Sequence, residues 1–209
     1  ISQYPADGEA SEALLQGADA AMYEAKKSGR GTYCFFTPEL SEATRHRQKL
    51  ENDLHRACAK GEFVLHYQPL VSTNSGCVSG VEALLRWLHP EQGLIPPNQF
   101  IPLLEDLGLM PQVGQWVLRT ACSQIAAWHK EGLETIRLAV NVSAQQFYRG
   151  DIVKTVEQVL RETGLPPQWL ELELTESLTL DDSETTLTIM RDLKAIGVCL
   201  SLDDFGTGY

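Results

Sequence analysis

Apolar residues recur along the chain with two periods, and each period predicts a different kind of element. Residues 11–27 are expected to form a helix that begins after an N-cap at Ser11, with one apolar stripe made of Leu14, Leu15, Ala18, Ala21, Met22 and Ala25. Residues 1–5 and 32–36 are expected to form short strands, so residues 1–37 are predicted to be a strand-helix-strand fragment. A charged helix over residues 38–60, ended by Gly61, is expected to join this fragment to the rest of the chain.

From residue 63 onward, strands and helices are predicted to alternate. The predicted strands cover residues 63–70, 78–87, 136–142, 169–175 and 198–203. The predicted helices cover residues 98–107, 111–130, 151–163 and 183–196, and a Pro/Gly-rich loop is expected at 89–97. Strands separated by amphipathic helices of about a dozen residues are typical of βαβ units, so the pattern predicts an α/β fold with a parallel sheet.

Composition and charge narrow the class of protein. The chain has 209 residues, 43% of them apolar, and a net charge of −11 without a cluster of Lys and Arg, which argues against a nucleic-acid polymer as partner. The five cysteines are widely spaced and never form a CxxC pair, so we expect reduced, mostly buried thiols in a cytoplasmic protein. No apolar run approaches the length of a membrane span. Both ends of the chain are expected to be cut, because it opens without Met inside a predicted strand.

Oxygen-bearing side chains gather where predicted strands end. Asn141, Glu173 and the pair Asp203 and Asp204 stand at or near strand ends, and Glu82 lies inside its strand. In β/α barrels the carboxyl ends of the strands form the rim that carries catalytic groups. An all-oxygen set suits Mg²⁺ or Mn²⁺, and two such ions about 4 Å apart can activate water for phosphodiester hydrolysis. The pattern therefore predicts a two-metal site.

Each of these motifs also has a plainer interpretation. Glu171, Glu173 and Thr175 share one face of their strand, which is either the polar interior of a barrel or the solvent side of an edge strand. The Asp203–Asp204 pair would also suit a helix cap or a solvated turn. Arg86, four residues after Glu82, either binds a substrate phosphate or forms a structural salt bridge. Gln68, near the end of its strand, could face the same site.

Taken in order, five motifs resemble the signature of EAL-domain cyclic di-GMP phosphodiesterases. They are EALLRW at residues 82–87, PNQFIP at 97–102, NVS at 141–143, ELTE at 173–176 and DDFGTG at 203–208. The stretch GADAAMYEAK at residues 17–26, followed by GRG at 29–31, resembles the end of a GGDEF diguanylate cyclase domain. The resemblance divides the chain into a GGDEF fragment (1–37), a linker helix (38–61) and an EAL domain (62–209).

The resemblance implies a TIM-like barrel that uses Mg²⁺ or Mn²⁺ to open cyclic di-GMP to linear pGpG in bacterial second-messenger signalling. It implies that Gln68 and Arg86 contact the substrate and that Glu176 steadies an active-site loop. It also implies a homodimer formed through the EAL domain, with GGDEF and sensory domains upstream that can carry a membrane anchor. The implied metal ligands are Glu82, Asn141, Glu173, Asp203 and Asp204.

Two departures from the family pattern limit these expectations. The GG(D/E)EF signature is absent, so residues 1–37 are not expected to make cyclic di-GMP. The chain also stops before the family's catalytic lysine, and since a complete barrel takes about 250 residues, about three strands are expected beyond Tyr209. The same residues would also serve a receptor that binds the dinucleotide without hydrolysing it. A third interpretation is a scaffold in which another chain stabilises an incomplete barrel.

Overall fold

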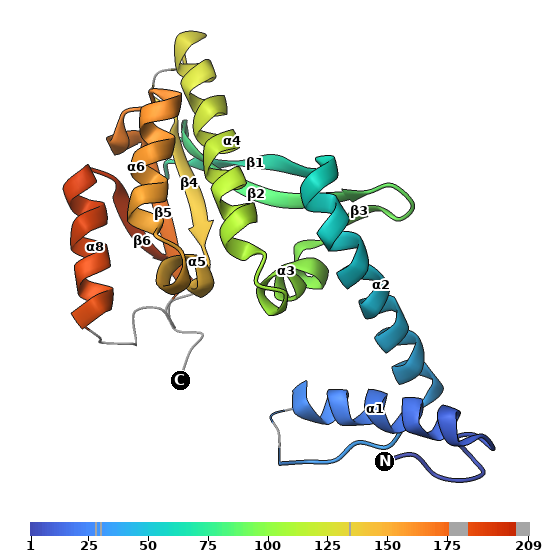
Figure 1. Ribbon diagram of the computed structural model, residues 1–209. Helices are drawn as coiled ribbons and strands as arrows, with labels where there is room; N and C mark the ends of the chain where they lie inside the picture. Colours follow the sequence, from blue (N-terminus) through green and yellow to red (C-terminus); the bar gives the residue numbers. More distant parts are fainter. Residues whose placement is uncertain (28, 30, 134, 176–183, 204–209) are drawn as a thin grey trace. The chain divides into compact units, whose positions relative to one another are not determined.

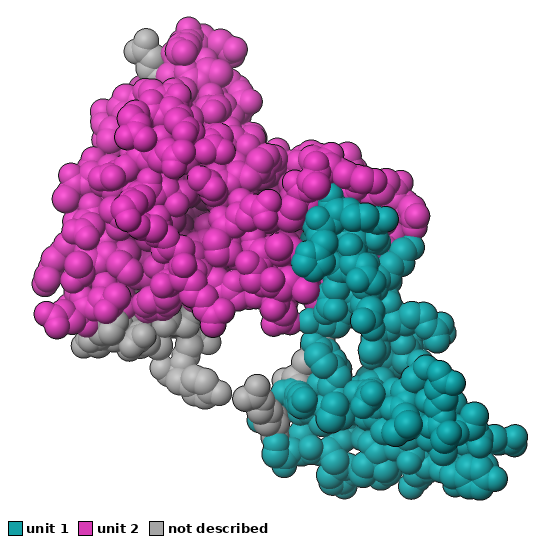
Figure 2. Space-filling view, in the orientation of Figure 1, with its two compact units in different colours: residues 1–56 teal, residues 57–209 magenta. Residues whose placement is uncertain are grey.

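The computed structural model describes residues 1–27, 29, 31–133, 135–175 and 184–203. The chain divides into two compact units, residues 1–56 and residues 57–209, which Figure 2 shows in different colours. The division falls within one long helix, α2, so each unit is described by itself.

The first unit contains helix α1 and most of helix α2, and the second contains a sheet and its covering helices (Figure 1). The helices are α1 (Ser11–Lys27), α2 (Pro38–Lys60), α3 (Pro97–Asp106), α4 (Met110–Lys130), α5 (Ala144–Arg149), α6 (Ile152–Thr163) and α8 (Glu184–Ile196), with a 3-10 turn, η1, at Pro167–Trp169. The strands are β1 (Phe63–Val71), β2 (Val78–His89), β3 (Gly93–Ile95), β4 (Arg137–Val142), β5 (Leu170–Thr175) and β6 (Cys199–Asp203).

The strands of the second unit form one mixed sheet. Its order is β1-β2-β4-β5-β6, with β3 added to the end of β2. β2, β4, β5 and β6 run parallel, as the alternation of strands and helices predicted, whereas β1 and β3 run antiparallel to β2. Helices α4, α6 and α8 follow one another across one face of the sheet (Figure 1), and α4 contacts β1, β2 and β4. This is the α/β class expected from the sequence.

The two strands predicted near the N-terminus are not formed, and this expectation was wrong. Residues 1–5 and 32–36 lie next to each other, because the Ile1 amino group donates a hydrogen bond to the Cys34 carbonyl and the Phe36 N–H donates one to the Ile1 carbonyl. These contacts involve one residue of the first segment, whereas a strand needs a ladder of several residues. The first unit is therefore built from helices and extended connections over its described residues.

Elements that the apolar pattern missed are all short. β3 lies in the loop predicted at 89–97, and α5 lies in the unassigned stretch after β4. Neither element spans enough residues to repeat a period of 3.6 or 2 clearly. β3 results from tertiary structure, because it pairs with the end of β2, whereas α5 begins at a capping box, which is a local signal.

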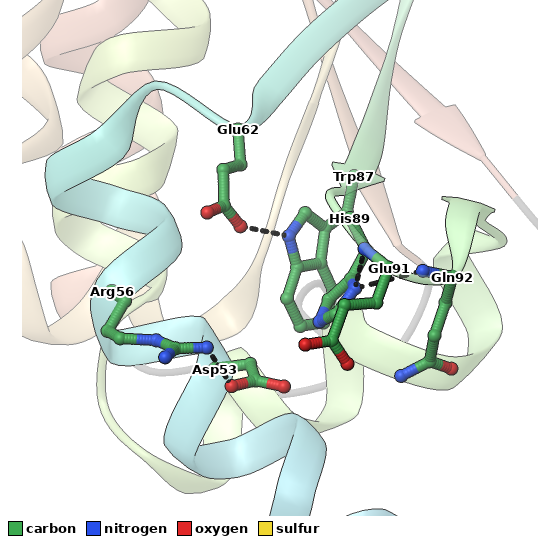
Figure 3. Close-up of polar contacts among 7 residues, drawn as sticks. All are labelled: Asp53, Arg56, Glu62, Trp87, His89, Glu91 and Gln92. Carbon is green, nitrogen blue, oxygen red and sulfur yellow. Dashed lines mark hydrogen bonds and ion pairs between the residues drawn. The ribbon is translucent and has the colours of Figure 1, made fainter.

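The carboxyl end of β2 is fixed by hydrogen bonds on both sides. Trp87, which is fully buried, donates its indole N–H to Glu62 Oε2 at 3.1 Å (Figure 3). His89 is also buried, and its Nδ1 accepts hydrogen bonds from the backbone N–H groups of Glu91 and Gln92 at 3.1 and 3.2 Å. Trp87 also packs on Phe63 and Phe100, so β2 extends as a regular strand past Arg86.

Two expectations about composition have mixed outcomes. All five cysteines are free thiols, but Cys122 is the buried one and Cys77 is exposed, so the expectation of mostly buried thiols was wrong. Burial raises the pKa of the Cys122 thiol to about 12, which makes it an unreactive core residue. Across the described residues, each helix is too short or too polar to cross a membrane.

Candidate functional site

The predicted site residues that the structure describes lie on the face of the sheet opposite helices α4, α6 and α8. Along β5, Leu170, Leu172 and Leu174 are almost completely buried, whereas the alternating residues Glu171, Glu173 and Thr175 are half-buried. Paired residues on neighbouring strands point their side chains to the same side of the sheet. The strand pairing therefore extends the face that carries Glu171, Glu173 and Thr175 across the sheet. We call it the polar face; it carries Gln68, Glu82, Arg86, Asn141, Glu173 and Asp203.

The strand register places the candidate ligands on an oblique line across the polar face. Glu82 pairs with Ala139, and Asn141 lies two residues beyond Ala139 toward the carboxyl end. Asn141 pairs with Glu173, which pairs with Ser201, and Asp203 lies two residues beyond Ser201. Strands of a barrel tilt relative to its axis, so groups that meet at one rim are expected to shift along successive strands in this way. The shift from Glu82 to Asp203 is thus the arrangement that a tilted sheet requires.

Glu82 and Asn141 are already in contact. The Asn141 amide donates a hydrogen bond from Nδ2 to Glu82 Oε1 at 2.7 Å, across the parallel pair β2 and β4. This bond uses the amide nitrogen and leaves the amide oxygen, which is the atom that a hard cation would bind. Glu82 lies inside β2 rather than at its end, as predicted, yet the bond links it to a residue at the end of β4.

Glu173 stands in the most unfavourable electrostatic environment of the polar face. Burial, followed by the charges of Glu82, Asp203 and Glu171, raises the pKa of the Glu173 carboxyl to about 7. Every one of these influences acts in the same direction and disfavours the ionised form. A cation at this position would reverse the effect, because it would attract all of these carboxylates.

Glu171 has a different role from Glu173, although both share a face of β5. Its Oε2 atom lies 3.6 Å from Arg137 Nη1, at the start of β4. β5 pairs with β4 on one side and β6 on the other, so the alternative of an edge strand with solvated acids is wrong. The acids of β5 belong to the polar face of a central strand, with Glu171 paired to a cation and Glu173 next to other acids.

Of the remaining predicted residues, the structure describes Arg86 and Gln68 but not Glu176 and Asp204. Arg86 and Gln68 lie on the polar face with Glu82, because β2 continues regularly to His89 and Gln68 pairs directly with Glu82. The Arg86 guanidinium donates a hydrogen bond from Nη1 to the carbonyl of Leu85 at 2.9 Å. Glu176 and Asp204 lie outside the described residues, so their places in the site stay predictions.

The donors fit a hard divalent cation in chemical type. They are carboxylate and amide oxygens on one face, where burial and then the acidic neighbours raise the pKa of Glu173. Ser201, next to Glu173 in register, adds a buried Oγ that has no hydrogen-bond partner among the described residues. Over the same residues, no three His, Cys, Asp or Glu side chains stand close enough to hold one ion in their present orientations. Binding would therefore require these side chains to turn toward the ion.

One part of the site escaped prediction, although the sequence carries a signal for it. Ser143 caps α5 immediately after β4, and Gln146 completes a capping box with it. The pattern S-x-x-Q before an apolar residue is a known signature of a helix start. It could have placed a helix directly after Asn141.

Known proteins resemble this chain in sequence and in fold. Across all of its residues, the chain is 46% identical to the bifunctional diguanylate cyclase/cyclic di-GMP phosphodiesterase MucR of Pseudomonas aeruginosa, and 40% identical to the cyclic di-GMP phosphodiesterase PdeR of Escherichia coli. It spans 30% and 31% of the length of these curated relatives.

A solved structure described as PaMucR phosphodiesterase, c-di-GMP complex, superimposes with a TM-score of 0.74 at 47% sequence identity. The superposition covers 77% of this chain and 65% of that one. The family model for the EAL domain matches residues 51–209. The resemblance of the five motifs at residues 82–208 to the EAL signature is thereby confirmed, and the chain belongs to the EAL domain family.

Proposed function

We propose that this chain is part of a bacterial enzyme that hydrolyses cyclic di-GMP to linear pGpG with the help of Mg²⁺ or Mn²⁺. The observation that carries the proposal is the oblique line of oxygen donors across four neighbouring parallel strands, in which burial and neighbouring acids raise the pKa of Glu173. The similarity to MucR and PdeR, both named as cyclic di-GMP phosphodiesterases, supports the same substrate.

Glu82, Asn141, Glu173 and Asp203 would hold the metal ions, together with Asp204. When bound, the two ions would supply Lewis acidity to the phosphodiester and lower the pKa of an attacking water. The protein's own contribution is to keep these oxygens on one face. The bond from Asn141 to Glu82 fixes two of them in advance, and Glu173 brings a carboxyl whose negative charge only a cation stabilises.

Arg86 and Gln68 would bind the dinucleotide. An Arg guanidinium matches a phosphate with two parallel hydrogen bonds, and Arg86 shares the polar face with Glu82. In this proposal Arg86 exchanges its hydrogen bond to the Leu85 carbonyl for the phosphate oxygens. Glu176 would steady an active-site loop of the TIM-like barrel.

Residues 1–37 are proposed to be the end of a GGDEF domain, joined by residues 38–61 to the EAL domain at 62–209. The alignment of all residues of this chain with MucR, whose name includes diguanylate cyclase, supports this division, and the EAL family match leaves residues 1–50 outside the EAL domain. We further propose a cytoplasmic EAL domain that forms a homodimer and follows GGDEF and sensory domains. Light scattering of the purified protein tests the dimer, which a monomeric mass at micromolar concentration would contradict.

A receptor that binds cyclic di-GMP without hydrolysis is the second candidate. The same polar face would serve it, because Arg86 and Gln68 need no metal to contact a dinucleotide. Hydrolysis and binding therefore have to be measured separately.

The test is Mn²⁺-dependent conversion of cyclic di-GMP to pGpG by the intact protein, followed by chromatography of the nucleotides. Asp203→Asn keeps the size of the side chain and removes its charge, so it should abolish turnover while the protein stays folded. Unchanged turnover in Asp203→Asn would reject the proposed site. Binding of cyclic di-GMP by the unaltered protein without any pGpG would favour the receptor.

A further inference from the structure

The start of α5 is held by a reciprocal pair of side chains. Ser143 Oγ accepts a hydrogen bond from the Gln146 backbone N–H at 3.3 Å, and Gln146 Oε1 accepts one from the Ser143 backbone N–H at 3.2 Å. The Ser143 hydroxyl also donates to Gln146 Oε1 at 3.1 Å. Gln146 is 5% exposed, which is unusual for a glutamine side chain. Its carboxamide is therefore committed to the turn that follows β4.

A glycine on the neighbouring helix makes room for this glutamine. A Cβ atom placed on Gly114, near the N-terminal end of α4, would lie 1.8 Å from Gln146 Nε2 and 2.3 Å from its Cδ. Any other residue at position 114 would therefore overlap the Gln146 carboxamide. The backbone of α4 thus forms one wall of the space that Gln146 fills.

Other contacts hold α5 in the same place. Gln145 donates a hydrogen bond from Nε2 to the Glu105 carbonyl at the end of α3, and Phe147 is 1% exposed. With only six residues, α5 is too short to gain much from helix formation alone. A cap on such a helix contributes mainly by fixing the direction in which the chain leaves β4.

The position of Asn141 depends more than that of Val142 on the direction in which the chain leaves β4. Val142 is buried among core residues, but the Asn141 side chain is exposed and lies two residues before the cap. Packing does not hold its amide; the backbone at the end of β4 and the 2.7 Å bond to Glu82 set its orientation.

We propose that Gln146 is a positioning residue: with Ser143 and the gap at Gly114, it fixes the end of β4 so that Asn141 presents its amide oxygen to the metal site. The inference rests on the proposed function, because it assigns Asn141 to that site. Gln146 acts through Asn141 and does not touch the ion.

The test measures Mn²⁺ binding to the intact protein by calorimetry, with Mn²⁺ as the sole ligand, and thermal unfolding of each variant. Gln146→Met keeps a side chain of similar length over Gly114 and removes the acceptor. Ser143→Ala removes the hydroxyl alone and is the second test variant, which keeps the test possible if Gln146→Met does not fold. Ser143→Thr, which keeps the hydroxyl, is the conservative partner. Asp151→Ala is the matched control, because the Asp151 side chain caps α6 by accepting a hydrogen bond from the Lys154 backbone N–H and is not bonded to Asn141 in the described part of the chain.

We expect Gln146→Met and Ser143→Ala to weaken Mn²⁺ binding by about tenfold to a hundredfold, the range seen when residues behind metal ligands are altered. Ser143→Thr and Asp151→Ala should bind Mn²⁺ as the unaltered protein does, although Asp151→Ala lowers the melting temperature. Unchanged binding in both test variants, or an equal loss in Asp151→Ala, would overturn the inference. Failure of the unaltered protein to bind Mn²⁺ would instead overturn the proposed function, so the two failures are distinguishable.

Discussion

Replacing Glu173 by Gln should stabilise the metal-free protein while it weakens metal binding. Burial and three neighbouring acids raise the pKa of Glu173 from 4.5 to about 7. Between these values the folded protein holds a proton that the unfolded chain releases, so its free energy of unfolding falls as the pH rises through the window. Above about pH 7 the ionised carboxylate lowers the free energy of unfolding by its full amount, and a neutral Gln removes this destabilisation.

The size of the effect follows from the shift. One pKa unit corresponds to about 1.4 kcal/mol, so the rise gives about 3 kcal/mol as an upper bound. Because Glu173 is half-exposed, water screens part of this, and we expect a gain of about 1–2 kcal/mol at pH 8. Most of the gain should vanish at pH 5, where the wild-type carboxyl is largely protonated in the folded state.

Urea unfolding in the presence of a chelator, at pH 5 and pH 8, measures these differences. Glu171→Gln is the matched control, because Glu171 lies on the same strand face but is paired with Arg137, so its removal should bring no gain. Mn²⁺ at a hundred times its dissociation constant should stabilise the wild type by about 2.7 kcal/mol and reverse the order of the two proteins. A gain of equal size at both pH values, or in both variants, would refute the electrostatic reasoning.

Two further predictions concern the ligand and the fold. Arg86→Ala should weaken cyclic di-GMP binding by about tenfold to a hundredfold, because one charge-assisted hydrogen bond is worth about 1.5–3 kcal/mol. Calorimetry in an Asp203→Asn background, where no turnover is expected, measures this; undiminished affinity would return Arg86 to a structural role. Gly164→Ala should lower the free energy of unfolding by about 1–2 kcal/mol, because Gly164 ends α6 with φ of +70° in the left-handed region. Urea titration tests it, and an unchanged midpoint would show that the backbone relaxes there at little cost.

The second unit could be predicted well from the sequence because its elements are long and regularly patterned. The alternation of Leu and Glu in β5 already assigned Glu171 and Glu173 to one face, and the apolar period of α4 placed that helix within two residues of its observed ends. Alternation within a strand is a local property, so it can be predicted from the sequence without knowledge of the neighbouring strands.

The pairing and register of the strands could not be predicted from the sequence alone. The pairing of Asn141 with Glu173, and the ion pair that separates Glu171 from Glu173, depend on the register of β4 and β5. The antiparallel direction of β1 also depends on which segments pair with each other. The same holds for the two predicted N-terminal strands, which are not formed. The fit of Gln146 against Gly114 joins residues from two helices, and a glycine in a helical pattern does not tell which neighbour requires it.

The alternation along β5 also has a consequence for how the domain assembles. A slip of β5 by one residue would turn Leu170, Leu172 and Leu174 toward the polar face and press Glu171 and Glu173 against the helices. Such a molecule would lose its core and its candidate ligands together, so a misaligned sheet could not persist as a stable but inactive species.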